Sequence, residues 1–418
     1  MIRIIPQSEI QSALSKRKVL SQDIYPLVFK IVNDVKDHGD RSLFKFIKQY
    51  DHKSSGSFIV EKKVMDQSMK QISSDVEQAL IFAIERVTAF HEQEKSHISS
   101  WIKKDVSNVT YGELFSPIDS VGLYVPGGSA SYPSSVIMNA VPAIVAGVHD
   151  IYIATPSDDR HIYAAARMLG IKKIYRMGGA HAVSALAYGT ESVGKVDKIV
   201  GPGNRYVTLA KKLVYGDVGI DTIAGPSEVV VIADHTANPA FIAMDLMAQA
   251  EHDEHAMSVL ITFKKSYVND VNEKINQNIN TLNRRRIIKK SLDKYGFAVI
   301  ARDAKHAMDI ANAIAPEHLE LAVGSPKSYL KYLKHAGAVF IGSFTPEVLG
   351  DYVAGPDHVL PTMGTARFSS GLGVHDFMKR TTMLEVKKDS FGFLGTHAII
   401  LGTMEGLDAH AMAVKIRL

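Results

Sequence analysis

The chain has 418 residues, a hydrophobic fraction of 46%, and a formal net charge of +4 from 48 basic and 44 acidic residues. At roughly 150 residues per domain, this length predicts two to three globular domains with real hydrophobic cores. The basic residues form no stripe, and their one cluster, "NRRRIIKK" (283–290), has the pattern of an exposed helical face. We therefore expect no nucleic-acid partner.

The chain contains no cysteine, which excludes disulfides, thiol nucleophiles, iron–sulfur clusters and Cys-bound zinc. The opening "MIRIIPQSEIQ" turns polar too early for a signal peptide. No run approaches the roughly 18 apolar residues that a membrane helix needs. We therefore expect a cytoplasmic protein with no membrane partner, in which any metal is bound by His, carboxylate, amide or water ligands.

The hydrophobic pattern changes its period along the chain. From about residue 20 to 100, apolar residues recur every three or four positions, which predicts helices. Short β-rich runs then alternate with helical segments, which predicts parallel sheets covered by helices. The predicted strands are 120–125, 150–155, 172–177, 197–200, 228–234, 256–263, 297–303, 318–323 and 338–342. The fold class is thus α/β, with two Rossmann-like parallel-sheet domains and small N- and C-terminal helical elements.

The two series of strands meet near "IAGPSE" (223–228), and this junction suggests the division of the chain into domains. We expect an N-terminal helical arm, a larger α/β domain built from two segments, a second α/β domain inserted between them, and a C-terminal helical tail. Their residues are, in that order, 1–18; 19–123 with 228–368; 124–227; and 369–418.

Glycine-rich turns follow the predicted strands at 125–135, 177–184, 201–206, 224–228 and 354–358. Such turns lie at the carboxyl ends of strands in open α/β sheets, where backbone N–H groups can bind a phosphate. None has the standard dinucleotide fingerprint, since "GPGNRY" has Tyr206 at the position of its third glycine. The turns indicate an extended ligand-binding edge with a non-standard cofactor site.

The stretch "MAQAEHDEH" (247–255) ends a predicted apolar helix in polar residues. Gln249 and His252 lie three residues apart and share a helix face, as do His252 and His255. This cluster fits a metal site, an acid–base pair or a solvated helix end. Two ligands at this spacing cannot enclose a metal, so a zinc site would need further donors from distant parts of the chain.

Three other polar stretches contain residues that could take part in catalysis or ligand binding. In "APEHLEL" (315–321), Pro316 ends a helix and places Glu317 and His318 at the start of a strand, where they are suited to activate water and to act as a general base. The plainer interpretation is a polar turn. "LGDYVAGPDHVLPT" (349–362) has the composition of an ordinary turn, and the lone His410 would ordinarily be structural.

Seven motifs, taken in order, closely resemble histidinol dehydrogenase. They are "GLYVPGG", "YPSSVIMNAVPA", "VDKIVGPGNRYV", "GIDTIAGPSEVVVIAD", "DLMAQAEHD", "PEHLEL" and "GDYVAGPDHVLPT". The resemblance runs from about residue 20 to the C-terminus. It implies an enzyme that oxidises L-histidinol to L-histidine through a bound aldehyde with reduction of two NAD, the final steps of histidine biosynthesis.

The resemblance also implies the cofactors, the site residues and the assembly. One Zn²⁺ per site is expected to be bound by Gln249, His252, Asp351 and His410, which also contact substrate. Glu317 would activate water and His318 would be the base. The further residues it implies are Ser227, His358 and Glu405 for substrate, and Tyr124, His181 and Asn204 for NAD. The ligand from the tail comes from the partner subunit in this family, so a homodimer with shared active sites is expected.

Two departures from the family pattern fall near these residues. The family usually has Gln where this chain has His181, and "GPNH" where this chain has Asp357 beside His358. We expect that a carboxylate at Asp357 raises the pKa of His358. Three alternatives stay open at this point: a related dehydrogenase of another small alcohol such as a sulfonated propanediol, a zinc hydrolase in which Glu317 activates water, and a non-catalytic binding protein.

Overall fold

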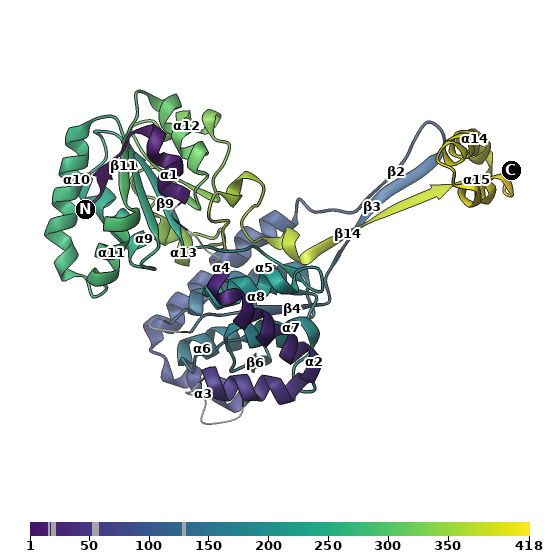
Figure 1. The fold of residues 1–418 in the computed structure, drawn as a ribbon, viewed down its shortest axis with the longest axis horizontal. Helices are drawn as coiled ribbons and strands as arrows, with labels where there is room; N and C mark the ends of the chain where they lie inside the picture. Colours follow the sequence, from purple (N-terminus) through teal and green to yellow (C-terminus); the bar gives the residue numbers. More distant parts are fainter. Residues whose placement is uncertain (16, 18–21, 52–57, 128–130) are drawn as a thin grey trace.

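The computed structural model of the chain describes residues 1–15, 17, 22–51, 58–127 and 131–418. It contains two parallel sheets covered by helices, and a long arm that carries the last two helices (Figure 1). The predicted α/β class with two parallel sheets is confirmed. Parts of two predicted features lie outside the described residues: the first glycine-rich turn at 128–130, and the end of the N-terminal arm at 16 and 18.

The larger sheet has six parallel strands in the order β1-β11-β10-β9-β12-β13. Its strands are β1 (Arg3–Ile4), β9 (Glu228–Ala233), β10 (Met257–Thr262), β11 (Phe297–Ile300), β12 (His318–Ala322) and β13 (Ala338–Ile341). Every residue of β9, β10 and β12 is buried, as expected for central strands of a sheet that helices cover on both faces.

Alternate residues of β9 pack into different cores on the two faces of this sheet. Val230 and Ile232 pack with α12, whereas Val229 and Val231 pack with α9, α10 and α11, which is the two-residue period of a strand. The helices of this part are α1 (Ile10–Ser15), α9 (Pro239–Ala250), α10 (Lys265–Asn278), α11 (Arg285–Tyr295), α12 (Ala304–Ile314) and α13 (Glu347–Tyr352).

The smaller sheet has five parallel strands in the order β6-β5-β4-β7-β8. They are β4 (Ser120–Tyr124), β5 (Asp150–Ala154), β6 (Lys173–Tyr175), β7 (Lys198–Val200) and β8 (Gly219–Ile220). Around it lie α2 (Tyr25–Tyr50), α3 (Lys62–Gln71), α4 (Ser74–Lys95), α5 (Pro133–Ala146), α6 (Arg160–Met168), α7 (Gly179–Tyr188) and α8 (Arg205–Val214).

The early helices and the N-terminal arm lie elsewhere than the expected division places them. We expected residues 19–123 to join the sheet of residues 228–368, but α2 packs on α7 and α8, α3 on α6, and α4 on α5, all beside the smaller sheet. β4 also belongs to that sheet. The N-terminal arm contributes β1 to the edge of the larger sheet. Periodicity reveals that a helix has an apolar face, but it does not reveal which surface that face covers.

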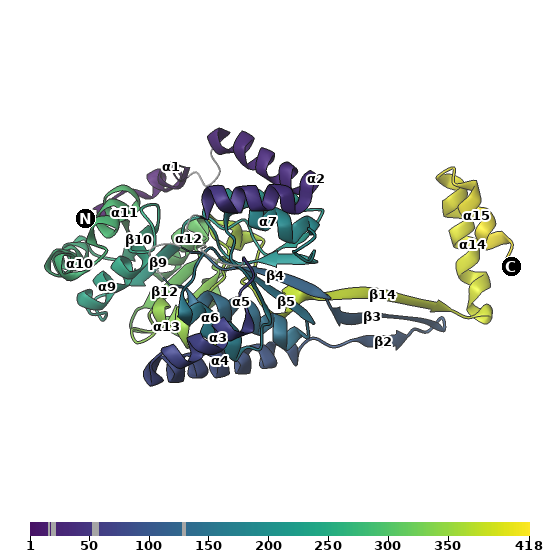
Figure 2. The same cartoon turned by 90° about the horizontal axis from the view of Figure 1, so that it is seen from below.

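A three-stranded antiparallel arm extends from the two sheets (Figures 1 and 2). It consists of β2 (Trp101–Lys104), β3 (Val109–Pro117) and β14 (Met378–Val386), in the order β14-β3-β2. The sequence pattern did not predict this arm. Beyond β14, α14 (Lys388–Met404) and α15 (Asp408–Lys415) pack against each other at its far end, away from both sheets.

The helical tail exposes large apolar side chains. Phe393, Ile400, Met404 and Ile416 are each more than half exposed, Met404 to 72%. Within the described residues, no helix combines the length and the hydropathy that crossing a bilayer requires. Exposed apolar groups that gather on one small element indicate an interaction surface.

Candidate active site

Glu317 and His318 lie where the sequence predicts them, at the amino end of β12. Ala315 ends α12 in the left-handed conformation, with φ of +53°, and the chain then turns through Pro316 into the strand. Both side chains are buried. β12 pairs with β9, so Glu228 at the start of β9 lies beside the pair.

The carboxyl of Glu317 is held by a backbone group. The N–H of Glu228 donates to Glu317 Oε2 at 2.9 Å. Burial raises the pKa of Glu317 well above its usual value, and the charges of Glu228 and Asp351 raise it further, against the hydrogen bond from Glu228. A carboxyl that keeps its proton toward neutral pH can both accept and donate a proton there.

The backbone of Glu228 orients the ring of His318. Its Nδ1 lies 3.1 Å from the carbonyl oxygen of Glu228, which assigns the N–H to Nδ1 because a carbonyl can only accept. Its Nε2 is buried without a hydrogen-bond partner and lies 3.9 Å from Asp351 Oδ1. Burial lowers the pKa of His318 to about 4, although the charge of Asp351 opposes this shift. The ring is therefore neutral at pH 7, with a free lone pair on Nε2.

Three of the four residues expected to bind zinc lie around this ring. Gln249 is buried in the last turn of α9, His252 follows in the next turn, and Asp351 lies in the last turn of α13. The charge of His252 lowers the pKa of His318, which places His252 close to the base. With its amide in the orientation that satisfies both neighbours, Gln249 Nε2 donates to both carboxylate oxygens of Glu347 at 2.9 Å.

The expected substrate residues Ser227 and His358 also reach this centre. Ser227 hydrogen-bonds the carboxyl of Glu317, and His358 Nδ1 lies 2.9 Å from the carbonyl oxygen of Asp351. The expectation that Asp357 raises the pKa of His358 is wrong. Burial lowers the pKa of His358, and the opposing charge is that of Asp351, because Asp357 turns away toward α4.

Glu405 and His410 are not brought to the site within one chain. Both are exposed, and they lie on or beside α14 and α15 at the end of the arm, far from α9 and α13 (Figure 1). In the described part of the chain, no three or more His, Asp and Glu side chains gather as a metal site. His252, Asp351 and the Gln249 amide fit zinc in donor chemistry, but they form an incomplete set that needs another donor.

The expected NAD residues lie together at the carboxyl edge of the smaller sheet. Tyr124 ends β4, and its hydroxyl accepts from Gly179 N at 3.0 Å at the start of α7. Gly201, with φ of +108°, lies so close that a Cβ there would collide with the carbonyl oxygen of Tyr124. These two contacts join the turns that contain His181 and Asn204 to the turn after β4.

The side chains of His181 and Asn204 have structural partners at this edge. His181 Nε2 lies 2.8 Å from Asp51 Oδ2 in a buried pair, and Asp51 also accepts from Gly178 N at 3.1 Å. Asn204 Oδ1 accepts from the N–H groups of Tyr206 and Val207, which caps α8. Because Asn204 Oδ1 is engaged in this way, its amide nitrogen is the group left for a ligand.

Sequence reasoning missed a set of buried charged residues next to the site: Arg17, Glu228, Glu320 and Glu347. Glu228 and Glu320 lie in the apolar runs "EVVVIAD" and "HLELAV". A charged residue inside a strand that is buried on both faces must have a polar partner. That rule marks Glu228 and Glu320 from the sequence, but it does not identify their partners.

The two parallel sheets, with the buried side chains of Glu317 and His318 at the start of β12, are typical of an α/β enzyme. The family model of histidinol dehydrogenase matches residues 14–418. Histidinol dehydrogenase of Aquifex aeolicus (strain VF5) is 46% identical over 407 residues, covering 97% of this chain and 95% of that protein. That of Listeria monocytogenes is 46% identical over 398 residues, covering 93% and 92%. A crystal structure of the Elizabethkingia anophelis enzyme superposes with a TM-score of 0.93 at 34% identity, covering 99% and 96%.

The chain belongs to the histidinol dehydrogenase family. The predictions of an oxidoreductase and of histidinol oxidation to histidine in histidine biosynthesis are thereby confirmed.

Proposed function

We propose that the chain oxidises L-histidinol to L-histidine in two successive steps at one centre, with a zinc ion bound and two NAD reduced per substrate. The observation that carries this proposal is the buried neutral imidazole of His318, whose Nε2 has no partner and lies 3.9 Å from Asp351. The neighbouring carboxyl of Glu317 supplies a second proton-transfer group, which a two-step oxidation through an aldehyde requires.

The zinc would be held by Gln249, His252 and Asp351, with His410 of the partner subunit as the fourth donor. When bound, zinc supplies a Lewis acid and a template that fixes the amino alcohol for reaction. The nitrogen and oxygen donors of this cysteine-free chain suit that metal. Ser227 and His358 border the same space, and we assign them and the partner's Glu405 to substrate contact.

His318 serves as the base of both oxidations. In the first, Nε2 takes the hydroxyl proton of the alcohol while the carbinol carbon loses hydride to NAD, which forms the aldehyde. In the second, Nε2 takes a hydroxyl proton of the aldehyde hydrate as the same carbon loses its second hydride, which forms the carboxylic acid. A positioned base of this kind contributes roughly 10²–10⁴ in rate.

Glu317 acts between the two oxidations. Its carboxylate takes a proton from the water that adds to the aldehyde carbonyl, and the carbonyl oxygen takes the proton that His318 Nε2 gained in the first oxidation. The hydrate forms, and the imidazole is neutral again for the second oxidation. Burial raises its pKa well above the usual value, which brings its basicity closer to the working pH. The hydrogen bonds from Glu228 N and Ser227 hold one orientation of the carboxyl.

The proposal includes a homodimer with shared active sites. The tail places Glu405 and His410 far from the remaining site residues of its own chain (Figure 1), and it exposes apolar side chains such as Phe393 and Met404. A second copy related by a two-fold axis would bury such a surface and exchange the two tails. NAD would bind along the edge formed by Tyr124, His181 and Asn204.

The test is the stoichiometry of NADH formed per L-histidinol consumed, measured by absorbance with zinc-loaded protein. Two NADH per substrate, lost with a chelator and restored by zinc, is the expected result. One NADH per substrate would overturn the two-step assignment. No turnover of histidinol by zinc-loaded protein would instead favour a dehydrogenase of another small alcohol, and hydrolysis of an ester or amide without NADH would favour a zinc hydrolase.

A further inference from the structure

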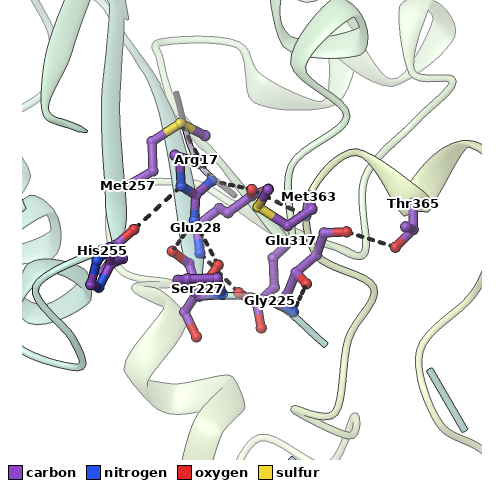
Figure 3. A network of polar contacts seen from close by, with 12 residues as sticks. Arg17, Gly225, Ser227, Glu228, His255, Met257, Glu317, Met363 and Thr365 are labelled. Carbon is purple, nitrogen blue, oxygen red and sulfur yellow. Dashed lines mark hydrogen bonds and ion pairs between the residues drawn. The ribbon is translucent and has the colours of Figure 1, made fainter. Parts of the chain in front are cut away.

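Arg17 connects the N-terminal arm to the active site. The residue lies after α1, outside any helix or strand, yet only 5% of it is exposed. An arginine is rarely buried to this extent unless it is paired. Figure 3 shows its guanidinium enclosed between the segment 225–228 and the start of β10.

The guanidinium uses each of its nitrogens. Nη1 donates to Glu228 Oε1 in a buried ion pair and also lies 3.7 Å from Met257 Sδ. Nη2 donates to the carbonyl oxygens of Pro226 at 2.7 Å and Ser227 at 3.4 Å. Nε donates to the carbonyl oxygen of His255 at 3.3 Å. One side chain thus binds three carbonyls and a carboxylate in two segments, residues 226–228 and the turn at His255.

The side chain of Glu228 contacts the N-terminal arm, and its backbone contacts Glu317 and His318. Its Oε1 binds Arg17 and accepts from Met363 N at 3.1 Å. Its N–H donates to Glu317 Oε2 at 2.9 Å, and its carbonyl accepts from His318 Nδ1 at 3.1 Å. The groups that hold the acid and the base therefore belong to a residue whose side chain is anchored by Arg17.

The second contact of Glu228 Oε1, with Met363 N, is also constrained. Met363 presents its N–H to Glu228 from a left-handed backbone, with φ of +57°, which a residue with a side chain adopts only when its surroundings impose it. Without Arg17, the buried carboxyl of Glu228 has no cation beside it, so it either takes up a proton or moves toward another partner. Removal of Arg17 would therefore displace Glu228 and the segment 226–228 rather than leave them in place.

We infer that Arg17 is a positioning residue: by binding Glu228 and the carbonyls of Pro226 and Ser227, it sets the geometry of Glu317 and His318. The inference rests on the proposed function for the roles of those two residues. Arg17 contacts neither of them directly. It acts on them through Glu228, from the N-terminal arm. Its effect is expected on the chemical steps and not on NAD binding, since Tyr124, His181 and Asn204 belong to the other sheet.

The experiment compares Arg17→Met and Arg17→Lys in the full-length, zinc-loaded protein. Displacement of reacting groups by about 1 Å costs roughly 10²-fold in rate, so the Met variant is expected to lose about that factor in kcat with an unchanged KM for NAD. The Lys variant can pair with Glu228 but cannot also reach two carbonyls, so its loss should be smaller. Hydrogen–deuterium exchange of the amides of 227–230 should be faster in both variants.

The control is Leu292→Ala, which removes buried methyl groups of α11 in the same sheet domain. It should lower Tm yet keep the wild-type kcat and the wild-type exchange at 227–230. Wild-type kcat in both Arg17 variants, unchanged exchange at 227–230, or an equal kcat loss in Leu292→Ala would each overturn the inference. If the wild-type protein does not oxidise histidinol, the proposed function fails, whereas the exchange measurement still decides whether Arg17 fixes the segment.

Discussion

Glu347 Oε2 lies 3.4 Å from His318 Nδ1, so the first residue of α13 borders the ring proposed as the base. Glu347 is fully buried, and its carboxylate also accepts both hydrogen bonds that Gln249 Nε2 can donate. One carboxyl therefore contacts the base and a proposed zinc ligand together. Outer partners of this kind orient metal ligands and tune their affinity.

From this relationship we expect Glu347→Leu to weaken zinc binding by roughly tenfold to hundredfold, the range seen when an outer partner is removed. The Gln249 amide would lose its acceptor and no longer hold one orientation. Glu347→Gln should lose much less zinc affinity, since the amide oxygen of the new side chain still accepts a hydrogen bond from Gln249. Zinc affinity is measured by competition with a chromogenic chelator. Equal affinity in both variants would contradict a role for Glu347 in orienting Gln249.

Shared active sites predict complementation between inactive variants. His318→Ala and His410→Ala should each be inactive as homodimers. Mixed after dissociation, they should recover about a quarter of the wild-type activity, because about half of the dimers are hybrid and each hybrid keeps one intact site of two. A mixture of His318→Ala with Asp351→Ala is the control, since both changes fall on the same half of the site and a hybrid of the two has no intact site. Absence of recovery in the first mixture would rule out a donor from the partner.

Glu317→Gln should separate the two oxidations. The amide cannot take a proton from water, so hydration of the aldehyde slows while the first oxidation keeps its base. In a single turnover, the first equivalent of NADH should form at near the wild-type rate and the second much more slowly. Histidinaldehyde supplied as its hydrate should be oxidised with a smaller loss. His318→Gln should slow both equivalents, and an equal slowing of both by Glu317→Gln would argue against water activation.

Asp357 should cost stability at neutral pH. Its Oδ2 has no hydrogen-bond partner and lies 3.8 Å from His91 Nε2, which also lacks one. Burial raises the pKa of Asp357 well above 3.8. Between 3.8 and the folded-state pKa, the folded protein holds a proton that the unfolded chain has released. The stability contributed by Asp357 is therefore greatest at low pH and falls as pH rises through that window.

Asp357→Asn should raise stability at neutral pH by about 1–3 kcal/mol, the cost of an unsatisfied buried group. The Asn oxygen keeps the bond from Val359 N, and its N–H points at His91 Nε2. The gain in Tm should grow as pH increases from about 4 toward 8. Exposed Asp270→Asn serves as the control and should show no such trend. A gain that is the same at every pH would exclude ionisation of Asp357 as the cause.

The strands and the position of Glu317 and His318 at the start of β12 were predictable because their signals are local. The nine predicted strands were apolar runs bounded by turn residues, and each contains one of β4–β7 or β9–β13. Pro316 marked the start of β12 and so the place of Glu317 and His318. The resemblance named the residues expected around them, and the structure brings Ser227, Gln249, His252, Asp351 and His358 to one centre.

The amino-acid sequence by itself determined the α/β class, the order of the elements and the candidate functional residues, since periodicity and turn residues act over a few positions of the chain. Only the tertiary structure decided which surfaces those elements cover. β14 pairs with β3 across more than 250 residues, and Arg17 reaches Glu228 across 211. Such pairings depend on complementary shape and charge between distant segments, and no local pattern encodes them.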